Sequence, residues 1–396
     1  MNSTLGSVFR RRGLRRSAAV ASFAVLTILV ACVPVSQEPA TTTTAPRVRP
    51  TPPKVVTPPT TPPSVTAPRP TPTAPPTTAA PTTTAPGAAP SGGLRVAEAL
   101  IPRAAVGTAG VRIGTASYTK VAQGDEVGAF RVNCTLSHMN FDDPIVFPGR
   151  TRATHLHAFY GNTGVNAATT AASVATTGNS TCTGGTANRS AYWAPAIIDT
   201  ATGAPVVSSD PNDPYVALNA LQVYYKTGYR GVESEAVRNF PAGLRMIAGT
   251  AASTSAQPTN IVHYSCDDAR LRSTLGSCAP GQILVMSIVF PQCWDGVNLD
   301  SPNHKSHMAY ASGGCPASHP VALPEITQNF RYKVPATGMA NWRLASDMYS
   351  GPAGYSGHAD WMNGWDPAVF QRVVDNCYRG GFDCRMNLLG EGNALT

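Results

Sequence analysis

Several motifs that commonly identify an enzyme class are missing from this sequence of 396 residues. It has no Gly-x-Ser-x-Gly elbow, no phosphate-binding loop and no dinucleotide-binding fingerprint. Those motifs place a nucleophile on a tight turn or wrap backbone amides around phosphates, so their absence argues against serine hydrolases, P-loop nucleotidases and Rossmann dehydrogenases. The sequence also has no Cys-x-x-Cys pair, which argues against a thiolate zinc site, and no His-Glu-x-x-His motif.

The region expected to fold also lacks net charge. The whole chain has a formal charge of +8 and a pI near 9.1. Nine of its 30 Lys and Arg residues precede residue 94, however, with only Glu38 against them among 22 acidic residues. Residues 94–396 therefore carry 21 basic and 21 acidic residues. A neutral domain exerts no long-range attraction on a polyanion, so we expect no nucleic-acid partner.

The N-terminus is typical of an export signal. Residues 10–16 (RRRGLRR) are basic, and residues 17–31 (SAAVASFAVLTILVA) form an apolar stretch too short for a comfortable bilayer span. The stretch ends in Leu-Val-Ala before Cys32, which resembles the bacterial lipobox, where the cysteine is diacylated. We expect residues 1–31 to be a lipoprotein signal peptide and Cys32 to be lipidated. An ordinary signal peptide with a chance cysteine is the alternative, and both the general and the twin-arginine export routes are open.

Residues 32–93 are rich in Thr and Pro. Such a composition cannot bury enough apolar surface to offset chain entropy, so it predicts a disordered tether biased to polyproline II. At about 3.1 Å per residue, about 60 residues span on the order of 190 Å when fully extended. The sequence therefore predicts a protein anchored to the outer face of the cell membrane through lipid alone, with its folded domain held out in the cell wall.

Nine cysteines are an odd number for an exported chain. If Cys32 carries lipid, eight remain, which can form four disulfides in an oxidising compartment. Eight cysteines allow 105 pairings. Pairing of sequence neighbours is the preferred arrangement: Cys134 with Cys182, Cys266 with Cys278, Cys293 with Cys315, and Cys377 with Cys384.

From residue 94 onward, short apolar runs are broken by Gly, Pro, Asn and Asp, and long amphipathic helices are scarce. The runs predict strands at 129–134, 196–199, 217–225, 244–247, 261–264 and 283–290. One helix is predicted at 367–377, with Pro367 in its first position after a capping Asp366. We expect residues 94–396 to form a single, mainly β domain: a monomeric two-sheet sandwich or jelly-roll-like fold with long loops, few short helices and bracing disulfides.

A series of long motifs runs in order through residues 126–385. They are SHMNFDDPIVFPG (137–149), HLHAFYGN (155–162), YWAP (192–195), FPQCWDG (290–296), NHKSHMAY (303–310), CPASHP (315–320) and GHADWMNGWD (357–366). Together they resemble the DUF1996 domain of fungal and actinobacterial secreted proteins. The resemblance implies a secreted single-domain unit, often attached to cell-wall-associated architectures. It assigns no catalytic residue, because the family name records an unknown function.

Two stretches, 137–162 and 290–310, hold the polar residues that best suit a site, since loops on a rigid scaffold often carry function. His155 and His157 are two apart, and His304 and His307 are three apart, so each pair can share one face. Such imidazoles suit a divalent metal such as zinc, copper or iron, completed by a carboxylate. The candidate metal ligands are His155, His157, His304 and His307, with Asp143, Asp295 or Asp300.

Two further schemes need no metal. Opposed histidines can act as general base and acid while Lys305 stabilises an anionic transition state, which would suit phosphodiester hydrolysis. Alternatively, carboxylates beside aromatic platforms suit hydrolysis or binding of glycosides. That scheme uses Asp142, Asp143, Asp295, Asp300 and Asp360, beside the aromatic residues Tyr192, Trp193, Trp294, Trp361 and Trp365. The candidate binding residues are Tyr192, Trp193, Trp294 and Asn162, and Asp360 beside His358 is a weaker candidate.

Purely structural roles weigh against each of these schemes. Loop His and Asp residues often satisfy backbone groups that would otherwise be buried without partners. We assign that role to His138, His263 and His319. The hypothesis for the remainder is that His155, His157, His304 and His307 converge on one surface site that acts on, or merely binds, a cell-wall polysaccharide. If the protein is an enzyme, a hydrolase is expected.

Overall fold

The computed structural model describes residues 94–122, 127–207, 220–227, 229–266, 268 and 270–396. All of them belong to one compact unit, residues 79–396. The predicted signal peptide, Cys32 and the whole predicted tether lie outside the described residues, as do the first positions of the strand expected at 217–225. Among the residues described, no helix has the length and apolarity needed to cross a membrane.

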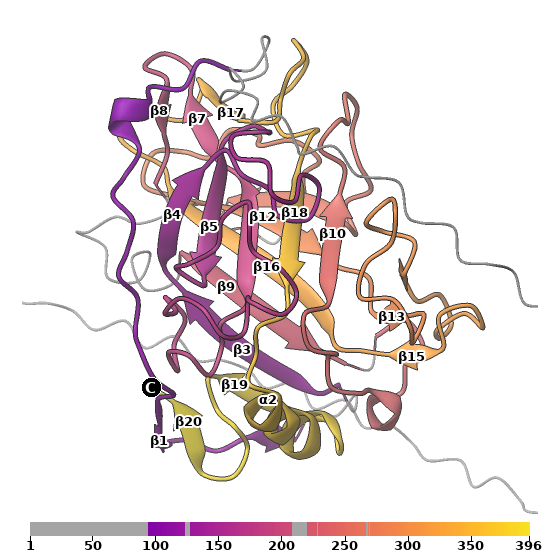
Figure 1. Ribbon diagram of the computed structural model, residues 1–396. Helices are drawn as coiled ribbons and strands as arrows, with labels where there is room; N and C mark the ends of the chain where they lie inside the picture. Colours follow the sequence, from indigo (N-terminus) through magenta and orange to yellow (C-terminus); the bar gives the residue numbers. More distant parts are fainter. Residues whose placement is uncertain (1–93, 123–126, 208–219, 228, 267, 269) are drawn as a thin grey trace, which may run out of the picture. The chain divides into compact units, whose positions relative to one another are not determined.

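Two antiparallel-rich sheets dominate this mainly β structure, as expected (Figure 1). The five-stranded sheet contains, in spatial order, β10 (Arg245–Gly249), β18 (His358–Met362), β6 (Ala191–Pro195), β5 (His157–Gly161) and β4 (Leu136–Asn140). The seven-stranded sheet contains β11 (Val262–Cys266), β12 (Ile283–Val289), β16 (Glu325–Lys333), β9 (Leu221–Lys226), β3 (Ala129–Cys134), β19 (Phe382–Met386) and β2 (Val121–Ala122).

The remaining elements are short. Three small sheets pair β1 (Ile113–Thr115) with β20 (Asn393–Leu395), β13 (Cys293–Trp294) with β14 (Met308–Ala309) and β15 (Val321–Ala322), and β7 (Ile197–Asp199) with β8 (Ala204–Pro205) and β17 (Trp342–Leu344). The helices are α2 (Pro367–Val373), its π-helical continuation η3 (Val374–Tyr378), and the 3₁₀ turns η1 (Glu98–Leu100) and η2 (Ser234–Ala236). As predicted, the Asp366 carboxylate caps α2 by accepting the backbone N–H groups of Ala368 and Val369.

The main core lies between the two large sheets. The rings of Tyr160 in β5 and Phe330 in β16 are 5.4 Å apart. The hydroxyls of Tyr192 in β6 and Tyr225 in β9 are 2.6 Å apart. The inward residues of both sheets belong to one buried apolar cluster, which is the packing expected of a sandwich.

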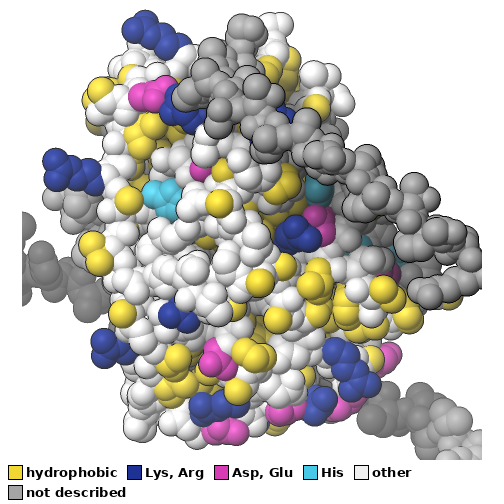
Figure 2. All heavy atoms as spheres, viewed as in Figure 1, with side chains coloured by type: hydrophobic (Ala, Val, Ile, Leu, Met, Phe, Trp, Pro, Cys, Tyr) yellow, Lys and Arg dark blue, Asp and Glu magenta, His cyan; other side chains and the backbone are white. Residues whose placement is uncertain are grey.

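The four disulfides join the sequence neighbours, as expected: Cys134–Cys182, Cys266–Cys278, Cys293–Cys315 and Cys377–Cys384. Charged side chains are scattered among uncharged and apolar surface on the face seen in Figure 2. No patch of one sign dominates that view, which agrees with the neutral composition.

Candidate metal centre

The candidate site lies on the outer face of the five-stranded sheet, the face that points away from the main core. Every residue of β5, β6 and β18 is buried, so these strands are covered on both sides. Side chains alternate along a strand. Tyr160, Tyr192 and Trp361 therefore enter the main core, whereas Phe159 and Trp193 join a second apolar cluster on the outer face.

The same alternation places three polar side chains on the outer face. His157 is two residues before Phe159 in β5, and Asp360 pairs with Trp193 across β18 and β6. His358 is two residues before Asp360 and shares its face. The loop between β4 and β5 brings Asp143 and His155 to the same place. Five potential metal ligands therefore meet on one sheet face.

Three imidazoles form the first half of the cluster. The ring centroids of His155 and His157 are 4.3 Å apart, those of His155 and His358 are 5.1 Å apart, and those of His157 and His358 are 5.8 Å apart. One nitrogen from each ring lies within 4.8 Å of the other two. Ligand atoms around a tetrahedral zinc ion are about 3.4 Å apart, given metal–nitrogen bonds of about 2.1 Å, so a small inward movement would complete such a site.

Backbone carbonyls orient two of the three rings. His157 Nδ1 donates to the carbonyl oxygen of Asp142 at 3.0 Å, and His358 Nδ1 donates to that of Ser356 at 2.8 Å. An N–H that donates through Nδ1 leaves a lone pair on Nε2, which is the usual arrangement around a metal-bound histidine. The Nε2 atoms of His155 and His157 are buried and have no hydrogen-bond partner within the described residues.

Two carboxylates form the second half. An oxygen of Asp143 and one of Asp360 lie within 4.8 Å of each other and of a nitrogen of His157. Asp143 Oδ1 accepts the backbone N–H groups of Ile145 at 3.0 Å and Val146 at 2.9 Å, which fixes the side chain. Both oxygens of Asp360 are buried, and neither has a hydrogen-bond partner in the described part of the chain.

Burial disfavours the charged form of all five groups. It lowers the pKa of His157 to about 4 and, together with the neighbouring His157, lowers that of His358 to about 4. The pKa of His155 lies well below its ordinary value for the same reasons. Burial raises the pKa of Asp143, and burial with the nearby Asp143 raises that of Asp360 well above the usual range. Neutral imidazoles are ready to ligate a metal, and a cation would favour ionisation of the two carboxyl groups.

A cavity of about 620 Å³ covers the cluster, a volume typical of ligand sites. His155, His358, Asp143 and Asp360 line it, whereas His157 is fully buried beside them. The other lining residues are Val146, Phe147, Thr154, Ile247, Gly249, Thr250, Ala251, Ala252, Ser253, Thr254, Asn303, His304, Lys305, Ser346, Met348 and Tyr349.

The loop between β13 and β14 contributes His304 and Lys305 to the same cavity. His304 has a left-handed backbone conformation, with φ at 57°, and its Nδ1 is 3.0 Å from Asp300 Oδ1. Lys305 Nζ donates to the carbonyl oxygen of Gly249 at 2.5 Å. Partial burial lowers the pKa of Lys305, while Asp360 acts in the opposite direction.

The structure therefore brings together most of the predicted catalytic residues, but not all. His155 and Asp143 share the cavity with His304 and Lys305, about 150 positions away along the chain, and His157 lies in the same cluster. His307 does not join them, because it is buried elsewhere. Its Nε2 atom is 2.7 Å from the Arg245 carbonyl oxygen, and its Nδ1 atom is 3.0 Å from Ser301 Oγ.

Some of the predicted site residues lie outside the cluster, where they support the fold. Of the predicted metal ligands, His155 and His157 belong to the cluster, and its third imidazole is His358 in place of His304 or His307. Asp295 Oδ1 accepts the backbone N–H groups of Val297 and Asn298 in a turn, and it does not line the cavity.

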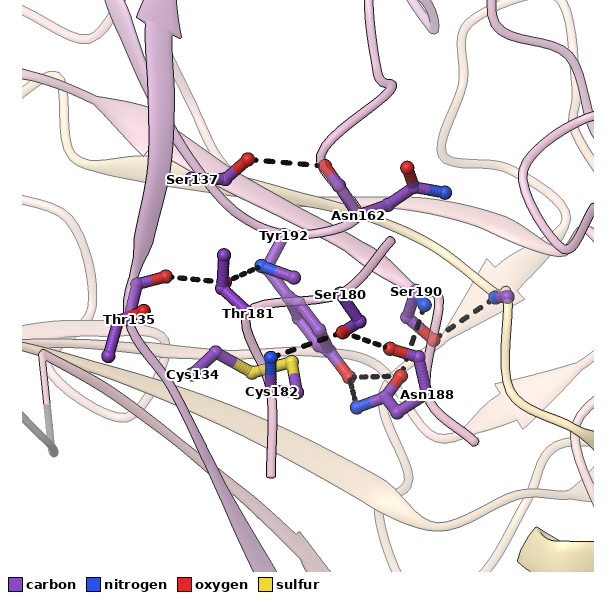
Figure 3. The surroundings of a disulfide bond; sticks show 12 residues. Cys134, Thr135, Ser137, Asn162, Ser180, Thr181, Cys182, Asn188, Ser190 and Tyr192 are labelled. Atoms are coloured by element: carbon purple, nitrogen blue, oxygen red, sulfur yellow. Dashed lines mark hydrogen bonds between the residues drawn. A yellow bond between two sulfur atoms is a disulfide. The ribbon is translucent and has the colours of Figure 1, made fainter. Parts of the chain in front are cut away.

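The predicted binding residues are mostly structural as well. Tyr192 and Trp193 are 0% exposed and cannot reach a ligand from their cores. Asn162 is also fully buried, and its amide donates to the carbonyl oxygens of Val174 and Thr177. Figure 3 shows Asn162 and Tyr192 within the hydrogen-bonded surroundings of the Cys134–Cys182 disulfide. Trp294 donates through Nε1 to the Asn298 carbonyl oxygen at 2.6 Å, and it does not line the cavity.

His358 and Asp360 are weaker candidates by sequence, yet both belong to the cluster. The sequence does contain a signal for them, because His358 and Asp360 are two residues apart, which is the same spacing as that of His155 and His157. One pair lies on β18 and the other leads into β5. The two pairs form a cluster because only β6 lies between those strands in the sheet. That adjacency joins segments about 200 residues apart and cannot be read from either motif alone.

The fold and site define a disulfide-braced β-sandwich with a histidine and carboxylate cluster beneath a surface cavity. The family model described as "Domain of unknown function (DUF1996)" matches residues 143–365, which is more than half of the chain. The chain therefore belongs to the DUF1996 family, and the matched range contains all five members of the cluster. Neither the curated proteins nor the solved structures offer a match to it.

Proposed function

We propose that this protein is an exported, lipid-anchored component of the cell envelope that binds a divalent transition-metal ion and hydrolyses a bond in a cell-wall polysaccharide. His155, His157 and His358 would hold the ion, with Asp143 and Asp360 as the carboxylate ligands. Imidazole nitrogens with carboxylate oxygens are a donor set suited to zinc or iron.

The buried polar atoms without partners carry this proposal. Both oxygens of Asp360 and the Nε2 atoms of His155 and His157 have no hydrogen-bond partner within the described residues. Each such group costs about 1–3 kcal/mol of folding free energy when it is buried unsatisfied. A single cation would satisfy several of these atoms at once, and nearly all buried polar groups in native proteins do have partners.

The cavity supports a hydrolytic role. A bound divalent ion supplies Lewis acidity and lowers the pKa of a bound water, which generates a nucleophile at neutral pH. The chain itself binds the substrate in the cavity, where Lys305 directs a positive charge and His304 adds a second polar side chain. Four of the five candidate ligands are buried, and electrostatic contacts are stronger in such low-dielectric surroundings than in water.

The proposed location rests on the sequence. The basic and apolar N-terminal segments, the lipobox-like cysteine and the long Thr- and Pro-rich tether together favour a position within the cell wall, where a polysaccharide is the abundant polymer. The neutral composition of residues 94–396 is compatible with an uncharged polymer.

Metal analysis of the purified full-length chain tests the proposal. In His358→Asn, the Asn amide nitrogen can replace the Nδ1 donor to Ser356, while the Nε2 ligand is lost. His263→Asn is the matched control, because His263 Nδ1 likewise lies 2.8 Å from a backbone carbonyl oxygen, that of Thr259, outside the cluster. We expect about one metal equivalent in the wild type and the control, and less than about one-tenth in His358→Asn. Wild-type protein that stays metal-free after incubation with zinc or iron would refute the proposal.

A metal-independent phosphodiesterase is a second candidate, favoured by the presence of His304 and Lys305 in one cavity. The two candidates differ in their response to chelation. The metal-dependent hydrolase loses its activity in a strong chelator and regains it with added zinc or iron, whereas the second candidate cleaves bis-p-nitrophenyl phosphate equally well in both conditions. Stoichiometric metal without any turnover would indicate a binding protein instead.

A further inference from the structure

We infer that the bond hydrolysed is an acyl linkage, an ester or amide that attaches an apolar acyl group to the envelope polymer, rather than a glycosidic bond. The inference rests on the proposed metal-dependent hydrolysis and specifies its substrate class. Two independent features of the cavity lead to it: the arrangement of the carboxylates and the apolar character of one wall.

The positions of the Asp143 and Asp360 carboxyl groups do not suit glycoside hydrolysis. That reaction commonly uses two carboxyl groups on opposite sides of the scissile bond, about 5–5.5 Å apart in retaining enzymes and about 6.5–9.5 Å apart in inverting ones. Asp143 and Asp360 instead offer oxygens within 4.8 Å of each other, and both belong to one cluster around His157. Groups gathered on one side cannot flank a sugar–sugar bond. They can hold a metal ion against the carbonyl oxygen of an acyl group.

Part of the cavity lining is apolar and exposed, and this part is called the apolar wall. Val146 is 37% exposed and Met348 is 52% exposed, and both line the cavity together with Phe147 and Ile247. Exposed apolar groups gathered at a cavity indicate the surface of a binding site. Polar lining residues such as Thr250, Ser253 and Asn303 can hydrogen-bond the hydroxyls of a polysaccharide, whereas the apolar wall cannot. An apolar acyl chain attached to that polymer matches the apolar wall.

Rigid loops hold this wall in place. The Val146 N–H donates to the candidate ligand Asp143 at 2.9 Å, so ligand and wall belong to one turn. Met348 follows the buried Asp347, whose carboxylate accepts the backbone N–H groups of Leu344 at 3.0 Å and Gly354 at 2.8 Å. Side chains held on ordered loops select substrates by shape, because they lose little conformational entropy on binding.

The reaction is balanced with water as the co-reactant. A water oxygen forms a bond to the acyl carbon, the bond from that carbon to the polymer oxygen or nitrogen breaks, and a proton from the water passes to the departing atom. The products are a carboxylic acid and the free hydroxyl or amine of the polymer. Lys305 donates to the carbonyl oxygen as it becomes negatively charged, using a proton not directed at Gly249.

Chromogenic substrates and matched surface variants test the inference in the full-length protein loaded with zinc. The substrates are the p-nitrophenyl esters of acetate, butyrate and octanoate, the corresponding anilides, and p-nitrophenyl glycosides. Val146→Ser and Met348→Ser remove apolar contacts at exposed positions. Val297→Ser is the control, because Val297 is 78% exposed and lies outside the cavity lining.

We expect hydrolysis of the esters or anilides, and none of the glycosides. Val146→Ser and Met348→Ser should each lower kcat/KM for octanoate about tenfold, with a smaller effect on acetate, since each methylene in an apolar pocket typically changes discrimination by about that factor or more. Val297→Ser should match the wild type. The wild type should also release carboxylic acids from purified, acylated wall polymer.

The possible outcomes distinguish the acyl assignment from the proposed metal centre on which it rests. Protein that binds about one equivalent of zinc but cleaves only glycosides, or no substrate at all, overturns the acyl assignment and leaves the metal centre standing. Protein that binds no metal overturns both. Equal loss of octanoate activity in Val146→Ser, Met348→Ser and Val297→Ser would remove the apolar wall as the acyl-binding surface.

Discussion

At the scale of single residues, Asp142 and Asp143 show how neighbouring carboxylates take different roles. Asp142 Oδ1 accepts the Arg152 N–H at 2.8 Å, and its Oδ2 accepts the Ala167 N–H at 3.0 Å. Its own backbone carbonyl oxygen orients His157. Asp142 therefore positions a metal ligand through the loop it ties together, whereas the next residue faces the cavity.

Asp142→Asn should weaken metal binding without removing a ligand. The new amide group turns an NH₂ toward one of the two backbone donors, so the loop and the His157 ring shift. Loss of such supporting contacts typically costs about 10–100-fold in metal affinity. Titration with zinc in a competing chelator measures the affinity. Asp295→Asn is the control, because its carboxylate also accepts two backbone N–H groups but lies outside the cavity. Equal affinities in Asp142→Asn and the wild type would exclude the positioning role.

His138 gives a pH-dependent prediction that does not involve the metal ligands. Its ring stacks on Phe159 with centroids 4.8 Å apart, and burial lowers its pKa below 6.5. As the pH falls below 6.5, the unfolded chain gains a proton at this site before the folded protein does. Stability therefore declines as the pH falls from neutrality toward the folded-state pKa.

His138→Phe keeps the stacked ring and removes the titrating group, so it should lose less stability than the wild type between pH 7 and pH 5. Urea unfolding at both pH values measures the difference, and all other titrating groups contribute equally to the two proteins. An equal or steeper decline in His138→Phe would contradict the prediction.

At the scale of elements, the sequence predicts segments that alternate or are strongly apolar, but not strands that are covered on both faces. The strands predicted at 129–134 and 283–290 correspond to β3 and β12. The strands β5, β6 and β18 were not predicted, because their sequences HAFYG, AYWAP and HADWM are buried on both faces and lack a clear period of two. The strands that build the candidate site were therefore the hardest to recognise.

The Cys293–Cys315 disulfide should act on the cavity through the loop that carries His304 and Lys305. It joins β13, where this loop begins, to residues just beyond β14, where it ends. The double variant Cys293→Ala/Cys315→Ala should lose about 3 kcal/mol of stability by the loop-entropy relation and bind substrate more weakly. Its metal content should stay unchanged, because the five candidate ligands lie on other segments.

Cys377→Ala/Cys384→Ala is the comparison for that experiment, because this shorter loop closes beside α2 and contributes no lining residue to the cavity. It should lose about 2 kcal/mol and retain the wild-type KM. Thermal unfolding and KM are measured for both double variants. A KM that rises equally in both would show that the disulfides act only through global stability.

At the scale of the whole molecule, the candidate site and the predicted export and anchoring segments lie in different parts of the sequence. Composition distinguishes residues 94–396, which carry no net charge, from the basic residues 1–93. The spacing within each histidine pair predicts a shared face, and His155 and His304 line one cavity. What spacing could not supply was the order β18–β6–β5, which selects His358 and Asp360 over His307 and Asp295. Long-range strand order depends on the total packing of both sheets and has no local signature.

Because Cys32 lies far along the chain from the cluster residues, we predict that removing its lipid leaves the candidate metal centre unchanged. Cys32 follows an apolar segment of 15 residues, which is shorter than the roughly 20 residues that a spanning helix needs. Stable attachment should therefore require the acyl chains on Cys32. In an actinobacterial host, Cys32→Ser should move the protein from the membrane fraction to the soluble and secreted fractions, with its metal content per chain unchanged. Retention of Cys32→Ser in the membrane would identify the apolar segment itself as the anchor, and a simultaneous loss of metal would show that anchoring and site assembly are coupled.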